Sequence, residues 1–147
     1  MSQSSAEPVV PSGIHHLRLT VTDIVRSKAF YSTLLGREPV IDFSDEVDEP
    51  GVREDRTKFY GGVVFSFGHQ VLGLRPVAEA GDTFSSTRVG LDHLGLLVDT
   101  RAELDRAAER LSAGGVPHGE IQNIASMIIL SLQDPDDINL ELCCPAG

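Results

Sequence analysis

The chain has 147 residues, of which 41% are hydrophobic and 23% are charged, a composition typical of a globular domain in water. Its 12 basic and 22 acidic side chains give a formal net charge of −10, which argues against a nucleic-acid partner. No stretch of about 18 apolar residues predicts a membrane span. The two cysteines are neighbours that cannot form an ordinary disulfide bond, so we expect a cytoplasmic protein.

The first half of the chain predicts one strand, one helix and three further strands. Residues 1–12 lack the basic start and apolar centre of a secretory signal, and we expect a disordered tail there. Residues 13–77 then form the first module. Its first strand is predicted in "IHHLRLTV", and its helix in "IVRSKAFYSTLL", with Thr22 or Asp23 as the cap and Gly36 as the end. "EPVIDF" is predicted as a short strand, and "KFYGGVVFSF" and "VLGLRPV" as a hairpin after an acidic loop.

The second half repeats this order in residues 90–147, after a linker at residues 78–89. "LDHLGLLV" is the predicted first strand. Thr100 and Glu103 have capping-box spacing at the start of a helix that ends at Gly114–Gly115. "VPHGEI", "SMIILSL" and "INLELCC" are predicted strands, the last two joined by the turn "DPDD". The tandem repeat predicts an α+β fold of two similar modules packed in one compact domain.

The first strands of the two modules carry a histidine in the same place. "GIHHLRLTV" begins at residue 13 and "GLDHLGLLV" at residue 90. Because side chains alternate along a strand, His16 and His93 lie on the face opposite the leucines. Glu141 also lies opposite its leucine neighbours in the last strand. We expect the helices to cover the leucine faces, so these three side chains would face the space between the sheets.

Two imidazoles and one carboxylate that face one cavity can hold a divalent metal and leave positions open for substrate and for water or dioxygen. The alternative is that each histidine is a hydrogen-bonded structural residue and the glutamate is solvated. The matching register of the histidines favours the metal site. His16, His93 and Glu141 are therefore the predicted ligands. Such a set suits iron(II), and manganese, zinc and nickel remain open.

The segments "HHLRLTVTDIVRSKAFYSTLLG", "DHLGLLVD" and "DPDDINLEL" resemble the vicinal oxygen chelate superfamily, which includes glyoxalases, bleomycin-resistance proteins and extradiol dioxygenases. The resemblance covers residues 13–144 and implies paired βαβββ modules whose sheets curl into a cup around a metal, with helices outside. It places His16, His93 and Glu141 at three of the family's four ligand positions and Gly73 at the fourth. Because glycine offers no ligand, the chain looks more like the three-ligand extradiol dioxygenases or fosfomycin-type thiol transferases than like glyoxalase I.

The resemblance implies a metal-dependent enzyme that chelates a small substrate through neighbouring oxygens, such as a catechol, a hydroxy-ketone or an oxoacid. Dioxygenation, isomerisation and lyase or transferase chemistry all remain open. The alternative is a non-catalytic binding protein of the bleomycin-resistance type, which would not need His, His and Glu in register. The family also implies a homodimer, with each site built within one chain or between two.

Two arginines are candidate substrate-binding residues. Arg18 shares a strand face with His16, and Arg75 shares its strand face with Gly73. A guanidinium group suits the paired oxygens of a carboxylate or enolate, so both residues are predicted to hold substrate. The alternative is that they reach the rim of the cup and pair with the chain's surplus acidic residues.

Overall fold

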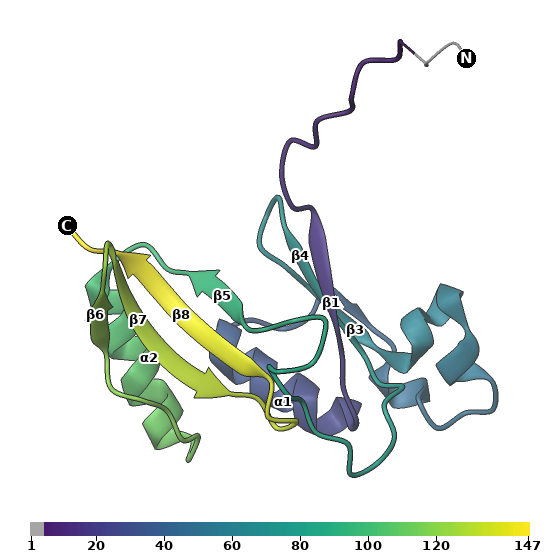
Figure 1. The fold of residues 1–147 in the computed structure, drawn as a ribbon. Helices are drawn as coiled ribbons and strands as arrows, with labels where there is room; N and C mark the ends of the chain where they lie inside the picture. Colours follow the sequence, from purple (N-terminus) through teal and green to yellow (C-terminus); the bar gives the residue numbers. More distant parts are fainter. Residues whose placement is uncertain (1–4) are drawn as a thin grey trace.

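The computed structural model describes residues 5–147, and these form two four-stranded sheets that each carry one long helix (Figure 1). The first module comprises β1 (His16–Thr20), α1 (Ile24–Leu35), β2 (Ile41–Asp42), β3 (Val63–Ser66) and β4 (Val71–Arg75), with short 3-10 helices at Ser44–Glu46, Val52–Glu54 and Arg56–Gly61. The second comprises β5 (Leu94–Leu97), α2 (Arg101–Ala113), β6 (Gln122–Ile124), β7 (Met127–Gln133) and β8 (Asn139–Pro145). The predicted α+β fold of tandem βαβββ modules is confirmed. Of the predicted tail, residues 1–4 lie outside the described part, and residues 5–12 form no helix or strand.

The two sheets have the same topology. The strand order is β1-β4-β3-β2 in the first sheet and β5-β8-β7-β6 in the second. In each sheet the module's first strand pairs in parallel with its last strand, and the remaining pairs are antiparallel. The register places Arg18 beside Gly73 in the first sheet and Gly95 beside Glu141 in the second. Corresponding positions of the two modules can therefore be compared directly.

Both helices begin and end where their local sequence predicts. Asp23 caps α1 by accepting a hydrogen bond from the Arg26 amide, and Gly36 ends the helix with a left-handed φ of 65°. Thr100 and Glu103 form a reciprocal capping box at the start of α2. Neither helix, nor any other in residues 5–147, is long and apolar enough to cross a membrane.

The leucine faces of the sheets are buried against the helices, as strand alternation predicts. The opposite faces carry the polar side chains and are more exposed. At the buried faces, large apolar side chains from both sheets and both helices form one hydrophobic core. Its members include Leu19, Leu72, Leu74, Phe65, Tyr31, Leu104, Leu111, Leu130, Leu140 and Leu142, each at most 5% exposed.

The helix of the first module is anchored to the second module by polar contacts. Tyr31 on α1 donates a hydrogen bond of 2.8 Å from its hydroxyl to Asp134, in the turn between β7 and β8. The Thr22 hydroxyl and the Arg26 guanidinium contact Asp136 in the same turn, at 2.5 Å and 3.0 Å. Both aspartates are at most 5% exposed. We call these five residues the α1 anchor. Because it joins distant parts of the chain, the two modules are held as one body.

The first of two strand predictions that are wrong is "KFYGGVVFSF". Strand β3 begins only at Val63, and Arg56–Gly61 forms a 3-10 helix instead. Phe59 and Tyr60 lie in the left-handed region, with φ of 49° and 58°. The chain turns there because Gly62 passes so close to β4 that a Cβ atom would lie 2.0 Å from the Leu74 carbonyl oxygen. The turn delivers two aromatic side chains to the edge of the first sheet.

The second wrong prediction is "VPHGEI". Within it only His118 makes a sheet contact, a single bridge to Leu132, and β6 lies further along at Gln122–Ile124. Pro117 has no amide hydrogen to give to a strand ladder. The His118 ring instead bonds the Ser112 hydroxyl at the end of α2 and the Gly119 carbonyl. The segment is therefore a connection between the helix and the sheet.

Candidate metal centre and substrate cavity

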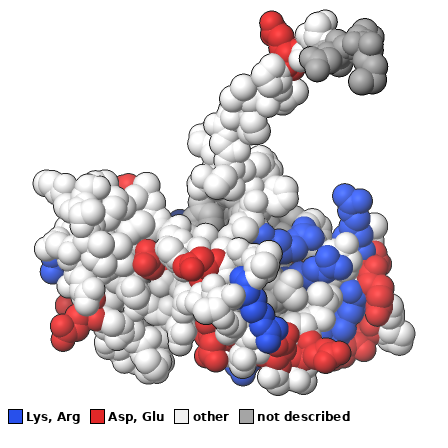
Figure 2. Space-filling model, in the orientation of Figure 1, with Lys and Arg blue, Asp and Glu red and all other residues white. Residues whose placement is uncertain are grey.

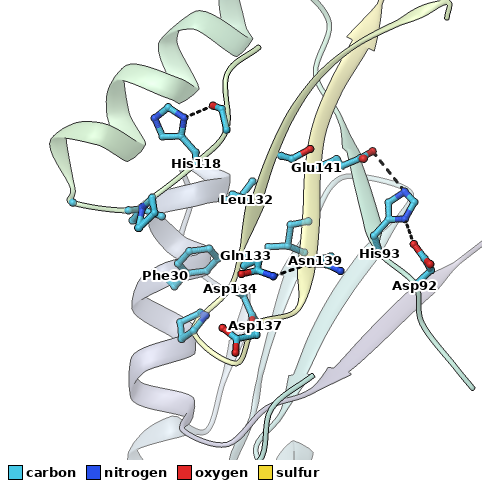
Figure 3. Close-up of a pocket in the computed structure, with 17 residues that line it drawn as sticks. Phe30, Asp92, His93, His118, Leu132, Gln133, Asp134, Asp137, Asn139 and Glu141 are labelled. Atoms are coloured by element: carbon cyan, nitrogen blue, oxygen red, sulfur yellow. Dashed lines mark hydrogen bonds and ion pairs between the residues drawn. The ribbon is translucent and has the colours of Figure 1, made fainter. Parts of the chain in front are cut away.

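A cavity of about 870 Å³ lies over the polar face of the second sheet (Figure 3). Strands β7 and β8 provide its floor, with Gln133, Asn139 and Glu141 among the polar lining residues. Phe30 of α1 closes one side with an apolar ring, and His93 lies at the opposite side. The cavity therefore combines apolar walls with a few convergent polar groups, which is the usual form of a small-molecule site.

Two predicted ligands, His93 and Glu141, face each other in this cavity. The distance between His93 Nε2 and Glu141 Oε2 is 3.6 Å. His93 immediately precedes β5, and Glu141 occupies the middle of the adjacent strand β8 beside Gly95. The register of the sheet thus brings an imidazole nitrogen and a carboxylate to one point.

Asp92 fixes the orientation of the His93 ring. Its Oδ1 accepts a hydrogen bond of 2.6 Å from His93 Nδ1, so that Nε2 points toward Glu141. This hydrogen bond, and to a lesser degree the charge of Glu141, raises the pKa of His93 above its usual value. A carboxylate on the outer nitrogen is the common support of a metal-binding histidine. The alternation of side chains along the strand does not point to Asp92, and the usable signal in the sequence is its place directly before the histidine in "LDHL".

His16 lies on the other sheet. It lines a separate cavity of about 530 Å³ together with Leu17, Arg18, Arg56 and Phe59. Its Nδ1 is 3.0 Å from Nδ1 of His15. Within residues 5–147, no group of three or more His, Cys, Asp or Glu side chains could hold one metal ion. One chain therefore brings His93 and Glu141 together and leaves His16 apart from them.

The two predicted substrate-binding arginines lie on the first sheet, on the same face as His16. Arg18 crosses the position of Gly73, where an added Cβ atom would lie 3.3 Å from Arg18 Nε. The Arg75 guanidinium carbon lies 3.7 Å from the centre of the Tyr60 ring. The position equivalent to Glu141 is thus covered by a neighbouring cation.

Cys143 lies on the same face of β8 as Glu141 but is not poised for chemistry. Its thiol is half-buried and donates a weak 3.6 Å hydrogen bond to the Leu96 carbonyl. Burial, followed by the negative charge of Glu141, raises the pKa of the Cys143 thiol. A protonated thiol is a poor nucleophile and a poor metal ligand.

Replacing Asp92 with alanine is expected to weaken metal binding by about 10–100-fold, because the His93 ring loses the partner that orients it. The affinity would be measured by competition with a chromogenic chelator at constant pH. Asp99→Ala removes an exposed carboxylate near the same strand and is the matched control. Equal affinities for the Asp92→Ala protein and this control would contradict the role assigned to Asp92.

Residues 13–142 match the family model described as the Glyoxalase/Bleomycin resistance protein/Dioxygenase superfamily. Among solved structures, a glyoxylase/bleomycin resistance protein/dioxygenase domain from Frankia sp. EAN1pec is 28% identical, with a TM-score of 0.72, over 94% of this chain and 95% of that one. A search of the curated proteins gave no match.

Two more distant structures share the fold. A lactoylglutathione lyase from Agrobacterium tumefaciens is 23% identical with a TM-score of 0.64, over 91% of this chain and 94% of that one. A fosfomycin resistance protein, FosX, from Listeria monocytogenes is 16% identical with a TM-score of 0.65, over 93% of this chain and 96% of that one. The architecture is therefore common to proteins described by quite different activities.

Proposed function

This chain belongs to the glyoxalase/bleomycin resistance protein/dioxygenase superfamily, and we propose that it is a metal-dependent enzyme that chelates a small substrate through two neighbouring oxygens. The observation that carries the proposal is the convergence of His93 and Glu141 at 3.6 Å, with the His93 ring held by Asp92, inside a cavity of about 870 Å³. An orienting carboxylate on the imidazole would be superfluous in a protein that only packs a ligand against apolar walls.

We propose that a divalent metal is held by His93 and Glu141 of one chain together with His16, which one chain alone leaves apart from them. The donors are two imidazole nitrogens and one carboxylate, a set that suits iron(II) and also accepts manganese, zinc or nickel. When bound, such a metal would act as a Lewis acid on the substrate's oxygens. The chain's own residues would orient the substrate: Phe30 gives an apolar wall, and Asn139 and Gln133 give polar groups near Glu141.

We propose further that His16 reaches the centre from a second copy of the chain, in a homodimer. His16 and the pair His93–Glu141 lie on separate sheets with separate cavities in one chain. Leu97, on the same open face of β5 as Gly95, is 69% exposed, and Ile14 beside β1 is 77% exposed. Exposed apolar side chains next to polar site residues are expected where another subunit covers the sheet.

Mixing two inactive variants tests the shared site. If the site combines His16 of one copy with His93 and Glu141 of the other, a dimer of one His16→Ala chain and one His93→Ala chain contains one intact site. Unfolding and refolding the two variants together should then restore about a quarter of the wild-type metal content, because about half of the dimers are mixed. Recovery of no metal above the separate variants would show that each site is built within one chain.

The enzyme proposal is tested by elemental analysis of freshly purified protein, followed by a panel of catechols, hydroxy-ketones and oxoacids under oxygen and under nitrogen. We expect a stoichiometric metal that a His16→Ala/His93→Ala double variant lacks. Turnover only under oxygen would indicate dioxygenation, and turnover in both would indicate isomerase, lyase or transferase chemistry. Equal background metal in both proteins, together with tight binding and no turnover, would instead indicate a binding protein of the bleomycin-resistance type.

A further inference from the structure

Three arginines on the open face of the first module lack acidic partners in a strongly acidic chain. Within residues 5–147, Arg18, Arg56 and Arg75 take part in no ion pair, as is also true of Arg37, Arg88, Arg106 and Arg110, but these three lie together on one module. Neighbouring cations are paired, since Arg53 contacts Asp48 and Lys58 contacts Glu46. Figure 2 shows blue side chains gathered over the first module, with acidic side chains bordering them. The three guanidinium groups therefore lie near cations that are already paired with carboxylates.

The space beside Gly73 explains why Arg18 lies flat on the sheet. In the second module Gly95 pairs with Glu141, whereas in the first module Gly73 pairs with Arg18 and leaves room for its side chain. An added Cβ at Gly73 would lie 3.3 Å from Arg18 Nε and 3.4 Å from its Cγ. The same place in the repeated architecture thus holds a carboxylate in one module and a guanidinium in the other, so the local charge is reversed.

Aromatic rings support these cations. The Arg18 guanidinium carbon lies 5.9 Å from the centres of both the Phe59 and Tyr60 rings, and that of Arg75 lies 3.7 Å from the centre of Tyr60. Phe59 is itself stacked on Phe43, with ring centres 6.1 Å apart and planes 11° from parallel. Phe59 and Tyr60 are held with positive φ, an unfavourable backbone for aromatic residues. We call Arg18, Arg56, Arg75, Phe59 and Tyr60 the arginine–aromatic shelf.

Stacking on aromatic rings orients the guanidinium groups of Arg18 and Arg75 but does not provide acceptors for their N–H donors. The Nε atom of Arg75 is buried and has no hydrogen-bond partner within the described residues. Arg18 and Arg56 line the cavity of about 530 Å³ beside His16. Oriented guanidinium donors next to an apolar ring and an open cavity match an oxyanion attached to an apolar body.

We propose that the arginine–aromatic shelf binds an anionic group of the substrate, a carboxylate or a phosphonate, with an adjoining apolar part against Phe59. The proposal rests on the proposed function only in naming the ligand as the substrate, because the shelf lies beside His16 and faces the same side of the sheet. The expected substrate is therefore an anion with a flat or compact apolar part.

The test is a titration of metal-stripped full-length protein with benzoate, phenylphosphonate and benzamide, followed by calorimetry at fixed ionic strength. Benzamide has the shape of benzoate without its charge. We expect both anions to bind at least about tenfold more tightly than benzamide, since a hydrogen bond to a charged group contributes about 1.5–3 kcal/mol. Arg18→Gln and Arg75→Gln should each weaken benzoate binding about tenfold or more.

Arg106→Gln, an exposed change on α2, is the matched control and should bind benzoate like the wild type. Unchanged melting temperatures would show that the shelf variants are folded. Equal binding of benzoate and benzamide, wild-type affinity in both shelf variants, or no binding of either anion would overturn the proposal. Because the protein is stripped of metal, a failed titration leaves the metal-centre proposal standing, and a protein without stoichiometric metal can still pass this titration.

Discussion

Glu141→Gln is expected to lower metal affinity by at least about 100-fold while the fold stays intact. Loss of a supporting residue outside the ligand set costs about 10–100-fold, and loss of the only carboxylate ligand should cost no less. Glutamine has nearly the same shape as glutamate but no charge, so the packing of β8 is preserved. Glu141 is half-buried, with its side chain 27% exposed. Competition with a chelator at constant pH measures the effect.

Two further proteins make this experiment decisive. Glu120→Gln removes an exposed carboxylate elsewhere in the second module and should bind metal like the wild type. His93→Ala should match Glu141→Gln, because the two side chains face each other across 3.6 Å. If Glu141→Gln retained its metal while His93→Ala lost it, the carboxylate ligand would have to come from another residue.

Asp134→Ala is expected to destabilise the protein by about 3–5 kcal/mol, because it leaves three buried donors without acceptors. The carboxylate is 4% exposed and accepts hydrogen bonds from the Tyr31 hydroxyl at 2.8 Å and from the amides of Asp136 and Ile138 at 2.8 Å and 2.9 Å. Burial raises the pKa of Tyr31, so its hydroxyl stays protonated and donates. Burial also raises the pKa of Asp134, against the opposing effect of these hydrogen bonds. Urea unfolding at neutral pH measures the loss.

Tyr31→Phe is the matched control. It removes one donor of the α1 anchor and keeps the hydrogen bonds from the amides of Asp136 and Ile138 to Asp134. It should cost about 1–2 kcal/mol. The double variant should lose less stability than the two single variants lose together, since both changes remove the same hydrogen bond. An Asp134→Ala protein no less stable than Tyr31→Phe would show that the turn between β7 and β8 holds itself without this carboxylate.

Helix boundaries followed from the sequence because the signals that set them are local. A cap at Asp23, a left-handed glycine at Gly36 and a capping box at Thr100 and Glu103 each involve residues within one or two helical turns. The strand in "KFYGGVVFSF" failed for the opposite reason. The close passage of Gly62 over the Leu74 carbonyl is a contact between distant residues, and no alternation pattern records it.

The same distinction applies to the site. The alternation of side chains along a strand predicts that His93 and Glu141 lie on the face opposite the leucines. The structure brings them together because β5 and β8 are neighbours. The same alternation places His16 on the polar face of its own sheet. It does not predict which polar faces meet, because that depends on long-range packing. The α1 anchor was invisible to pattern analysis for this reason as well. The sequence "DPDD" predicts a turn at Asp134 and Asp136 but not their contacts with α1.

The glycine of the matching strand pair lies on the last strand in the first module, at Gly73, and on the first strand in the second module, at Gly95. A protein assembled from two second halves would now hold two carboxylates and no basic shelf, and one assembled from two first halves would hold no carboxylate at this place. The two halves are therefore no longer equivalent at this place: the second offers a carboxylate and the first a guanidinium, and two copies of either half alone could not supply both groups.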